Sequence, residues 1–371
     1  MDFDFSESQK ILLNTARDFL NQEAKNYARE IEKTEEGHSP ELWARMADLG
    51  WMGLIFPEKY GGTEGSFLDL TLLLEEMGKA IIPGPFIPSL ASGLSILHFG
   101  SEEQKEKYLP RLTEGKLLLA PALIKPVVVG NESPLIRDER LIERNGTFQL
   151  HGTRLFVPYA HSADCFLYQA HTDGGKTFFL IQSDEHGVKT SSLKTMASDR
   201  QGEVVLDGVE VREAAILGQK NKGNEVANRL EEWGALFNCA FILGMLERVL
   251  FMAVDHAKQR EQFGKLIGSL QAIQHQFADM VTDVDKVKFL TYQAAWKLDE
   301  HLEATKEIAM AKAYASDASR KVCLLGIKIH GGIGITEEHD MQLYFRMSKA
   351  AEVAFGDGDY HREMVAQLLG L

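Results

Sequence analysis

Apolar positions near the start of the chain recur with the spacing of amphipathic helices. Ser6 and Gln9 match a capping box, and an apolar stripe over residues 11–20 follows them. The Ser39-Pro40 pair is typical of a helix start, and Gly50 is a typical helix end. We therefore expect one helix after Ser6 and another between Ser39 and Gly50.

Two more helices are predicted further along. Ser66 predicts the start of a helix over Phe67–Met77, and Gly78 predicts its end. A second capping box begins at Ser101, and its helix is expected to end before Pro110. Helices are thus the elements that we expect before the pattern changes.

The middle of the chain alternates short apolar runs with turn signals. The dipeptides that favour tight hairpin turns are Asn145-Gly146, Asp173-Gly174 and Asp207-Gly208. The runs that they separate include Thr153–Val157, Thr177–Gln182 and Glu203–Leu206. This pattern predicts a small antiparallel β domain.

Helical patterns return at about residue 226 and continue from there. Ala235–Lys258 and Leu270–Leu298 are apolar on one side, and long successive helices with short connections favour a bundle. The predicted fold class is therefore α+β. It has an N-terminal helical domain (1–122), a middle antiparallel β domain (123–225) and a C-terminal four-helix bundle (226–371).

The net negative charge of the chain limits the kinds of molecule that it is expected to bind. The 371 residues carry 54 Asp and Glu against 40 Lys and Arg, a formal net charge of −14. An acidic chain without a basic cluster is a poor nucleic-acid binder. The N-terminus lacks the basic and apolar regions of a signal peptide, and no uninterrupted apolar stretch approaches the length of a membrane span. We therefore expect a cytoplasmic protein.

Cysteine and histidine spacing does not indicate a metal site. Cys165, Cys239 and Cys323 lack the CxxC spacing, so buried thiols are expected. The histidines lack the HExxH spacing. The glycine-rich run His330–Gly334 follows a helical pattern, and by itself it favours a turn between helices over a phosphate cradle. No metal is predicted.

Several spaced motifs resemble those of one flavoprotein family. In the first part of the chain they are Leu49-Gly50, Pro57–Gly62 and Glu75–Lys79. In the last part they are Arg260–Gly264, Gln271–Ile273 and Gly331–Gly334, with Thr336, Glu338 and Arg346. In this order they resemble the acyl-CoA dehydrogenase family over essentially the whole chain. The resemblance implies the same helix–β–helix order that the hydrophobic pattern predicts.

The resemblance implies FAD as the cofactor and an acyl-CoA thioester as the substrate. It assigns to FAD the residues Arg260, Gln262, Phe263, Gln271, Lys328, Gly331 and Gly332, with Lys328 at a position where the family usually has glutamine. A guanidinium such as that of Arg260 suits a pyrophosphate because its planar fork donates parallel hydrogen bonds. In the family the Arg260 segment reaches the FAD of a neighbouring subunit, so a homo-oligomer or a hetero-oligomer is implied.

The two positions where the family carries its catalytic glutamate hold other residues in this chain. Counted from Gly331, the usual position is Phe355. Counted back from Arg260, the position used by a smaller branch is Gly234. Neither side chain can accept a proton. The Thr-Glu-Pro stretch that the family places beside the flavin is Ile124-Lys125-Pro126.

Another carboxylate is therefore a candidate base. Asp357 and Asp359 lie just after Phe355, and Glu352 lies about one helical turn before it. A base here would need a pKa raised by burial. Asp357 can equally be the N-cap of a final helix that begins at Gly358.

Three further interpretations stay open. The chain can be the base-lacking subunit of a hetero-oligomeric acyl-CoA dehydrogenase, like bacterial relatives that act on steroid side chains, dicarboxylic acids or ring compounds. The segments Ile82–Pro85 and Phe355–His361 resemble those relatives. It can be a family offshoot with elimination or oxygenation chemistry. It can also be a non-enzymatic module that binds acyl-CoA or a partner, although the retained Arg260, Gln262 and Phe263 argue against losing the cofactor.

The predicted function is the FAD-dependent α,β-desaturation of an unusual acyl-CoA thioester. By analogy with the family, Ser89 and Ser92 line the acyl region. The electron acceptor that the resemblance implies is an electron-transferring flavoprotein.

Overall fold

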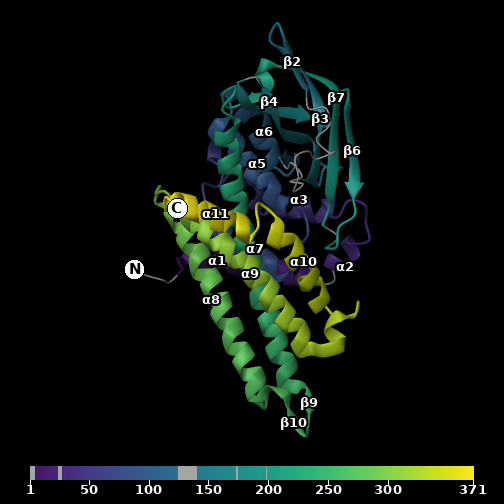
Figure 1. Ribbon diagram of the computed structural model, residues 1–371, viewed down its shortest axis with the longest axis vertical. Coiled ribbons are helices and arrows are strands. Elements are labelled where there is room, and N and C mark those ends of the chain that lie inside the picture. The colour runs from purple at the N-terminus through teal and green to yellow at the C-terminus, as the bar shows by residue number, and fades with distance from the viewer. Residues whose placement is uncertain (1–4, 24–26, 124–139, 173, 198) are drawn as a thin grey trace. The chain divides into compact units, whose positions relative to one another are not determined.

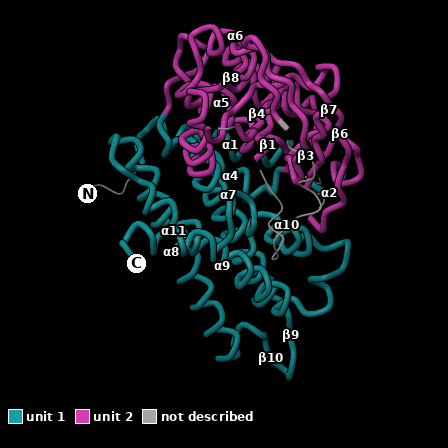
Figure 2. The backbone as a smooth tube through the Cα atoms, turned by 45° about the horizontal axis from the view of Figure 1, so that its top comes forward, with its two compact units in different colours: residues 1–30, 66–82, 234–371 teal, residues 31–65, 83–233 magenta. Residues whose placement is uncertain are grey.

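The computed structural model describes residues 5–23, 27–123, 140–172, 174–197 and 199–371. Its contacts divide the chain into two compact units, each made of separate stretches of sequence (Figure 2). Unit 1 comprises residues 1–30, 66–82 and 234–371, and unit 2 comprises residues 31–65 and 83–233. The three-domain division at residues 122 and 225 stays a prediction.

Unit 1 is built from helices (Figure 1). They are α1 (Glu7–Glu23), α4 (Phe67–Lys79), most of α7 (Gly223–Gln259), α8 (Gln271–Asp299), α9 (Thr305–His330), α10 (Met341–Val353) and α11 (Gly358–Leu368), and the short α2 (Tyr27–Ile31) ends at the boundary of the unit. Helix α9 packs against α8, α10 and α11. The capping box predicted at the start of α1 is confirmed, because the Gln9 amide N–H donates to Ser6 Oγ and the Ser6 N–H donates to the Gln9 side chain.

Gly78 does not end its helix, contrary to the prediction. It lies inside α4, where a Cβ would come within 2.1 Å of the Phe241 carbonyl oxygen on α7. In turn, a Cβ on Gly244 of α7 would come within 1.8 Å of the Glu75 carbonyl oxygen on α4. The two glycines therefore let the backbones of α4 and α7 cross in close contact, which the sequence pattern of a single helix does not show.

Helix α7 is long and apolar enough to cross a membrane by length and composition alone. An 18-residue stretch of it has a mean hydropathy of 1.7, and 67% of that stretch is buried inside the protein. The sequence pattern did not predict a stretch of this length, because isolated polar residues interrupt the apolar ones. Burial of this extent is that of the core helix of a soluble protein.

Unit 2 combines helices with two sheets. Its α-helices include α3 (Pro40–Asp48), α5 (Phe86–Phe99) and α6 (Glu102–Thr113), with short 3-10 turns η1 (Trp51–Gly53) and η2 (Glu58–Tyr60). Ser39 caps α3, and Ser101 with Gln104 forms the capping box of α6, both as predicted. Pro110 lies within the last turn of α6, so this helix runs past the predicted end.

The strands of unit 2 form two four-stranded sheets (Figure 1). One sheet has the order β1 (Leu119–Ala122), β4 (Cys165–Thr172), β5 (Gly175–Gln182) and β8 (Ile216–Leu217). The other has the order β2 (Arg140–Arg144), β3 (Thr147–Pro158), β7 (Gln201–Arg212) and β6 (Val188–Leu193). Neighbouring strands pair antiparallel, as predicted, except that β1 pairs parallel with β4.

The predicted turns have three outcomes. Asn145-Gly146 forms the tight turn between β2 and β3, with φ values of 51° and 76°. Asp207-Gly208 does not form a turn, because it lies inside β7, where the register against β3 shifts and Gly208 has a φ of 73°. This dipeptide is therefore a β-bulge. β4 and β5 pair as a hairpin, whereas Asp173 of its predicted turn lies outside the described residues.

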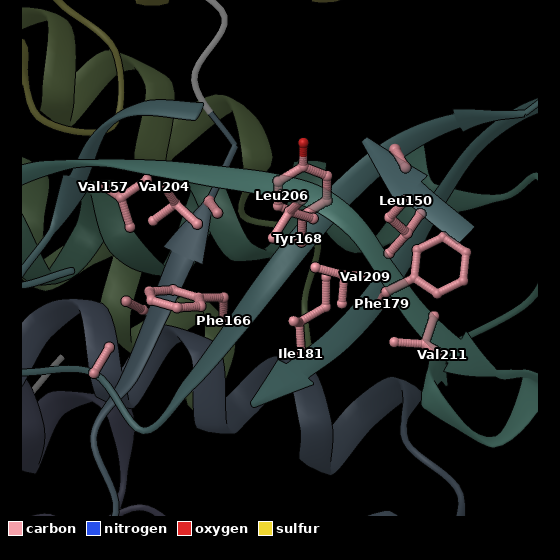
Figure 3. Close-up of a cluster of buried hydrophobic side chains, with 14 of the residues drawn as sticks. Leu150, Val157, Phe166, Tyr168, Phe179, Ile181, Val204, Leu206, Val209 and Val211 are labelled. Carbon is pink, nitrogen blue, oxygen red and sulfur yellow. The ribbon is translucent and has the colours of Figure 1, made fainter. Parts of the chain in front are cut away.

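Apolar side chains from both sheets form the core of unit 2 (Figure 3). Phe166 and Tyr168 come from β4, and Val204 and Leu206 come from β7. Alternate residues of β4 and β5 belong to this core, as the period of a strand requires.

Candidate functional site: a hairpin, a glycine turn and a corner

The segment after α7 forms a small exposed hairpin at one end of the long helices (Figure 1). Its strands are β9 (Glu261–Gln262) and β10 (Lys265–Leu266). Phe263 and Gly264 make the turn with φ values of 56° and 73°, the left-handed pair of a two-residue hairpin. Phe263 is 90% exposed. An aromatic ring that is this exposed among the described residues is typical of a contact site for another molecule.

Three polar side chains around the hairpin are available to a ligand. Arg260 follows the last residue of α7, Gln262 is in β9, and Gln271 begins α8. All three are exposed, and their side chains make no hydrogen bond or ion pair within the described part of the chain. They present a guanidinium and two amides, the donor groups that bind phosphate oxygens.

A glycine turn ends α9. Gly331 has a φ of 67° and a ψ of −145°, a conformation that favours glycine. A Cβ placed on Gly331 or Gly332 would meet no described atom within 4 Å. The space beside this backbone is therefore open, and Lys328, one turn earlier on α9, is exposed beside the turn.

Histidines join the hairpin segment to the glycine turn. His256, four residues before Arg260, stacks on His330, the residue before Gly331, with ring centroids 4.5 Å apart. His339 packs edge-on against His330 with centroids 4.7 Å apart. We call these three residues the histidine cluster. The sequence pattern gave no sign of this cluster, because His256 lies far from the other two histidines along the chain.

These two segments fit FAD by their chemistry. The pyrophosphate of FAD needs cationic and amide donors, which Arg260, Gln262 and Gln271 provide. Close approach of the cofactor needs backbone without side chains, which Gly331 and Gly332 provide. The exposed ring of Phe263 suits a planar or apolar part of a ligand.

A second feature is the corner between α10 and α11, residues 354–357. Phe355 adopts a φ of 56° and Gly356 a φ of 89°. The Phe355 ring lies on Gly234 of α7, so a Cβ on Gly234 would come within 2.2 Å of the ring. The two positions that the resemblance assigns to a catalytic glutamate are thus neighbours in space, and an aromatic ring fills the room above one of them.

Buried donors from neighbouring helices hold this corner. The Lys312 ammonium on α9 donates to the carbonyls of Glu352 at 3.0 Å and Gly356 at 2.8 Å and to the Ser316 hydroxyl at 2.8 Å, with a longer contact of 3.3 Å to the Ala351 carbonyl. Lys312 is fully buried, and burial lowers its pKa to about 8. An ammonium at the carboxyl end of α10 is favoured by the dipole of that helix.

Two further side chains complete the set of donors. His361 Nε2 donates to the Phe355 carbonyl at 2.8 Å, and burial lowers the pKa of His361 to about 4. Asn238 of α7 donates to the carbonyls of Ala351 at 2.7 Å and Ala354 at 3.4 Å. Donors from three helices therefore satisfy the backbone at the end of α10 and in the corner.

The structure uses both candidate carboxylates in other contacts. Asp357 is exposed and caps α11, with its Oδ1 accepting the Tyr360 N–H at 2.9 Å. Glu352 points toward two cations, with its carboxylate 3.3 Å from Arg320 and 3.5 Å from Lys349. The expectation that Asp357 begins a final helix is confirmed.

The two serines assigned to the acyl region lie on α5 in unit 2. Ser89 Oγ donates to the Leu119 carbonyl at 3.1 Å and accepts the Leu119 N–H at 3.2 Å, which ties α5 to strand β1. Ser92 is fully buried, and its hydroxyl has no hydrogen-bond partner among the described residues. The stretch Ile124-Lys125-Pro126 lies outside the described residues.

Possible metal ligands are distributed through the described part of the molecule. No group of three or more His, Cys, Asp or Glu side chains there is placed to hold an ion. The three cysteines are buried free thiols, as expected, and burial raises their pKa values to about 12.

Comparison with known proteins gives matches over most of the chain. Residues 6–116 match the model "Acyl-CoA dehydrogenase, N-terminal domain", and residues 221–370 match "Acyl-CoA dehydrogenase, C-terminal domain". An acyl-CoA dehydrogenase of Bacillus subtilis is 31% identical over 98% of both chains. A caffeyl-CoA reductase–Etf complex subunit of Acetobacterium woodii is 29% identical over 98% of this chain and 99% of the relative.

A solved structure shares the whole fold. A chain of the ChsE4–ChsE5 complex from Mycobacterium tuberculosis superposes with a TM-score of 0.90, at 29% identity, over 100% of this chain and 99% of that chain. The predicted order of N-terminal helices, middle β sheets and C-terminal helical domain is confirmed by this match and by the two domain models.

Proposed function

Because the chain belongs to the acyl-CoA dehydrogenase family and uses FAD, as that family does, we propose that it is the base-lacking subunit of a two-component acyl-CoA dehydrogenase. The homologous partner subunit supplies the carboxylate that removes the alpha proton of an acyl-CoA thioester. The pair carries out the α,β-desaturation of an unusual acyl group in the cytoplasm.

The observation that carries this proposal is the packing of Phe355 on Gly234. Both family positions for the base lack a proton acceptor, and the ring fills the room beside Gly234. Asp357, the nearest alternative in sequence, is exposed, and one of its carboxylate oxygens is used as the N-cap of α11. The similarity to a chain of a two-component complex supports the same conclusion.

This chain's own contribution is to bind and orient the cofactor. We propose that Arg260, Gln262 and Gln271 hold the pyrophosphate, that Phe263 packs on the cofactor, and that Gly331 and Gly332 let it approach. Lys328 adds a cation nearby, and Ser92 offers its unpartnered hydroxyl to the acyl end of the substrate. When bound, FAD accepts the hydride from the beta carbon. The similarity to an Etf-complex subunit supports an electron-transferring flavoprotein as the acceptor.

The test compares the chain alone with the chain purified together with a homologous subunit from a neighbouring reading frame. A panel of straight-chain, branched and aryl acyl-CoA thioesters is added without oxygen, and flavin bleaching is followed. We expect bleaching by at least one thioester with the pair and none with the single chain. Replacing the partner's glutamate by glutamine should abolish it. Bleaching by the single chain would refute the proposal.

A second candidate is a homo-oligomer in which Asp357 is the base. It is favoured by the position of Asp357 beside Phe355 and by its second carboxylate oxygen, which makes no hydrogen bond in the described structure. In this case Asp357→Asn abolishes bleaching, whereas Asp359→Asn, on the same exposed turn, leaves it unchanged. Equal bleaching by both variants eliminates Asp357.

A further inference from the structure

The histidine cluster lies at the junction of the two segments that we assign to FAD. His256 belongs to α7, His330 ends α9, and His339 precedes α10. The rings of His256 and His330 are stacked at 4.5 Å and 27°. The stack therefore brings together two segments that are far apart along the chain.

The partners of two rings define where their protons are. His330 Nδ1 is 2.8 Å from the Gly326 carbonyl, so this nitrogen carries the proton and Nε2 carries the lone pair. His339 Nδ1 accepts the Met341 N–H at 3.1 Å at the start of α10.

The surroundings also favour neutral rings. Burial and the neighbouring imidazoles lower the pKa of His330, and burial lowers the pKa of His256, with His339 and Arg260 adding to the effect. Among the described residues, the charged and titratable groups that act on these two rings are Arg260 and the histidines of the cluster. The carboxylate of Asp340, next to His339, is already bound by Arg29 at 2.7 Å.

We propose that His256 and His330 are positioning residues that hold the hairpin segment and the glycine turn together only while their imidazoles are neutral, so that FAD is released in mildly acidic solution. The proposal rests on the proposed assignment of both segments to FAD. It does not depend on which subunit supplies the base.

The number of protons bound by stacked and by separated rings sets the direction of the pH effect. Separated in water, each ring takes up a proton near its ordinary pKa of about 6.5, whereas the stacked rings take it up only at lower pH. Separation therefore consumes protons from solvent, and acid favours it. The contribution of the stack is fully present above about pH 6.5 and is lost as the pH falls below that value. Protonation places the charge on His330 Nε2, against a second ring at 4.5 Å.

The test measures the dissociation constant of FAD between pH 7.5 and pH 5 on the protein as purified, including any subunit that co-purifies. We expect affinity to fall by at least about tenfold across this range. His256→Phe keeps a stacked ring without a titrating nitrogen, so it should bind FAD at pH 7.5 and lose most of the pH dependence. His301→Ala, an exposed histidine at the end of α8, should behave as the unmodified chain.

Hydrogen–deuterium exchange gives a second readout that does not depend on FAD or on activity. After correction for intrinsic exchange rates, protection of residues 260–270 and 331–337 should fall together between pH 7.5 and pH 5, and His256→Phe should remove this loss. If the protein never retains FAD but protection of both segments falls together, the assignment of these segments to FAD is wrong. The proposal that the histidine stack holds the two segments together then stands. The proposal would be overturned if neither exchange protection nor FAD affinity depended on pH. It would also be overturned if His256→Phe kept the same pH dependence as the unmodified chain.

Discussion

The Phe355 ring lies directly on Gly234, so that a single added Cβ at residue 234 would be 2.2 Å from a ring carbon. The ring can lie there only because residue 234 has no side chain. This contact occupies the place where the family resemblance leads us to expect catalytic carboxylates.

Gly234→Ala should destabilise unit 1 because the new methyl group overlaps the Phe355 ring. We expect a loss of about 1–3 kcal/mol in the free energy of unfolding, measured in urea. Phe355→Ala removes the overlap, so the double variant should be less destabilised than the sum of the single variants. Additive losses would show that the cost of Gly234→Ala does not come from overlap with the Phe355 ring.

Phe355→Glu should give the single chain a base of its own. The corner is held by Lys312, Asn238 and His361 through backbone carbonyls, which the substitution leaves in place. We expect acyl-CoA to bleach the flavin about 10²–10⁴-fold faster than in Phe355→Gln, the range that a positioned general base contributes. Equal rates in the two variants would place the base position elsewhere.

Lys312→Met should destabilise the corner. The substitution removes a donor from the carbonyls of Glu352 and Gly356, which are left without this partner, and we expect a loss of about 2–4 kcal/mol at pH 7. Lys306→Met, on the same helix but half exposed, should change stability by less than about 0.5 kcal/mol. Urea unfolding of both variants checks the difference.

The pH dependence of stability offers a separate check on Lys312. Its folded pKa of about 8 is lower than that of an unfolded lysine, so the unfolded chain holds this proton up to about pH 10.4. Because the unfolded state binds more protons between these values, this group makes stability rise with pH from about 8. Lys312→Met should lack that rise, and a rise of equal size in the variant would assign it to other groups.

An ionic cluster around the buried carboxylates of Glu75 and Glu76 joins α4 to α7, and we expect its members to respond unequally to substitution. Lys79 lies 2.6 Å from Glu75, 2.9 Å from Glu76 and 2.7 Å from Glu247. Lys79→Met would leave these carboxylates without their shared cation, and we expect a loss of about 3–5 kcal/mol. Glu75→Gln should cost much less, because burial and Glu247 already raise the pKa of Glu75.

The raised pKa of Glu75 determines how its contribution to stability changes with pH. A raised folded pKa means that the folded state keeps the proton after the unfolded chain has lost it near pH 4.3. The contribution of Glu75 is therefore fully present below that pH and is lost as the pH rises through the folded pKa. Thermal unfolding from pH 4 to pH 7 should show a smaller decline in Glu75→Gln, and an unchanged profile would contradict the assignment.

Local signals in the sequence were reliable where one short segment contains the whole interaction. The capping boxes at Ser6 and Ser101 and the turn at Asn145-Gly146 formed as predicted, because their hydrogen bonds and dihedral angles lie within a few residues. Gly78 and Asp207-Gly208 were predicted wrongly for the converse reason. Their role depends on a second helix or strand, which the local pattern does not contain.

The sequence by itself determined the helix–β–helix order, the motifs that identify the family and the absence of a proton acceptor at residues 234 and 355. Hydrophobic period and spaced motifs are written along the chain, so they can be read without a structure. Only the tertiary structure decided that Phe355 fills the room above Gly234, that Lys312 is buried beneath the corner and that His256 stacks on His330. These contacts join residues distant in sequence, and packing in three dimensions selects them.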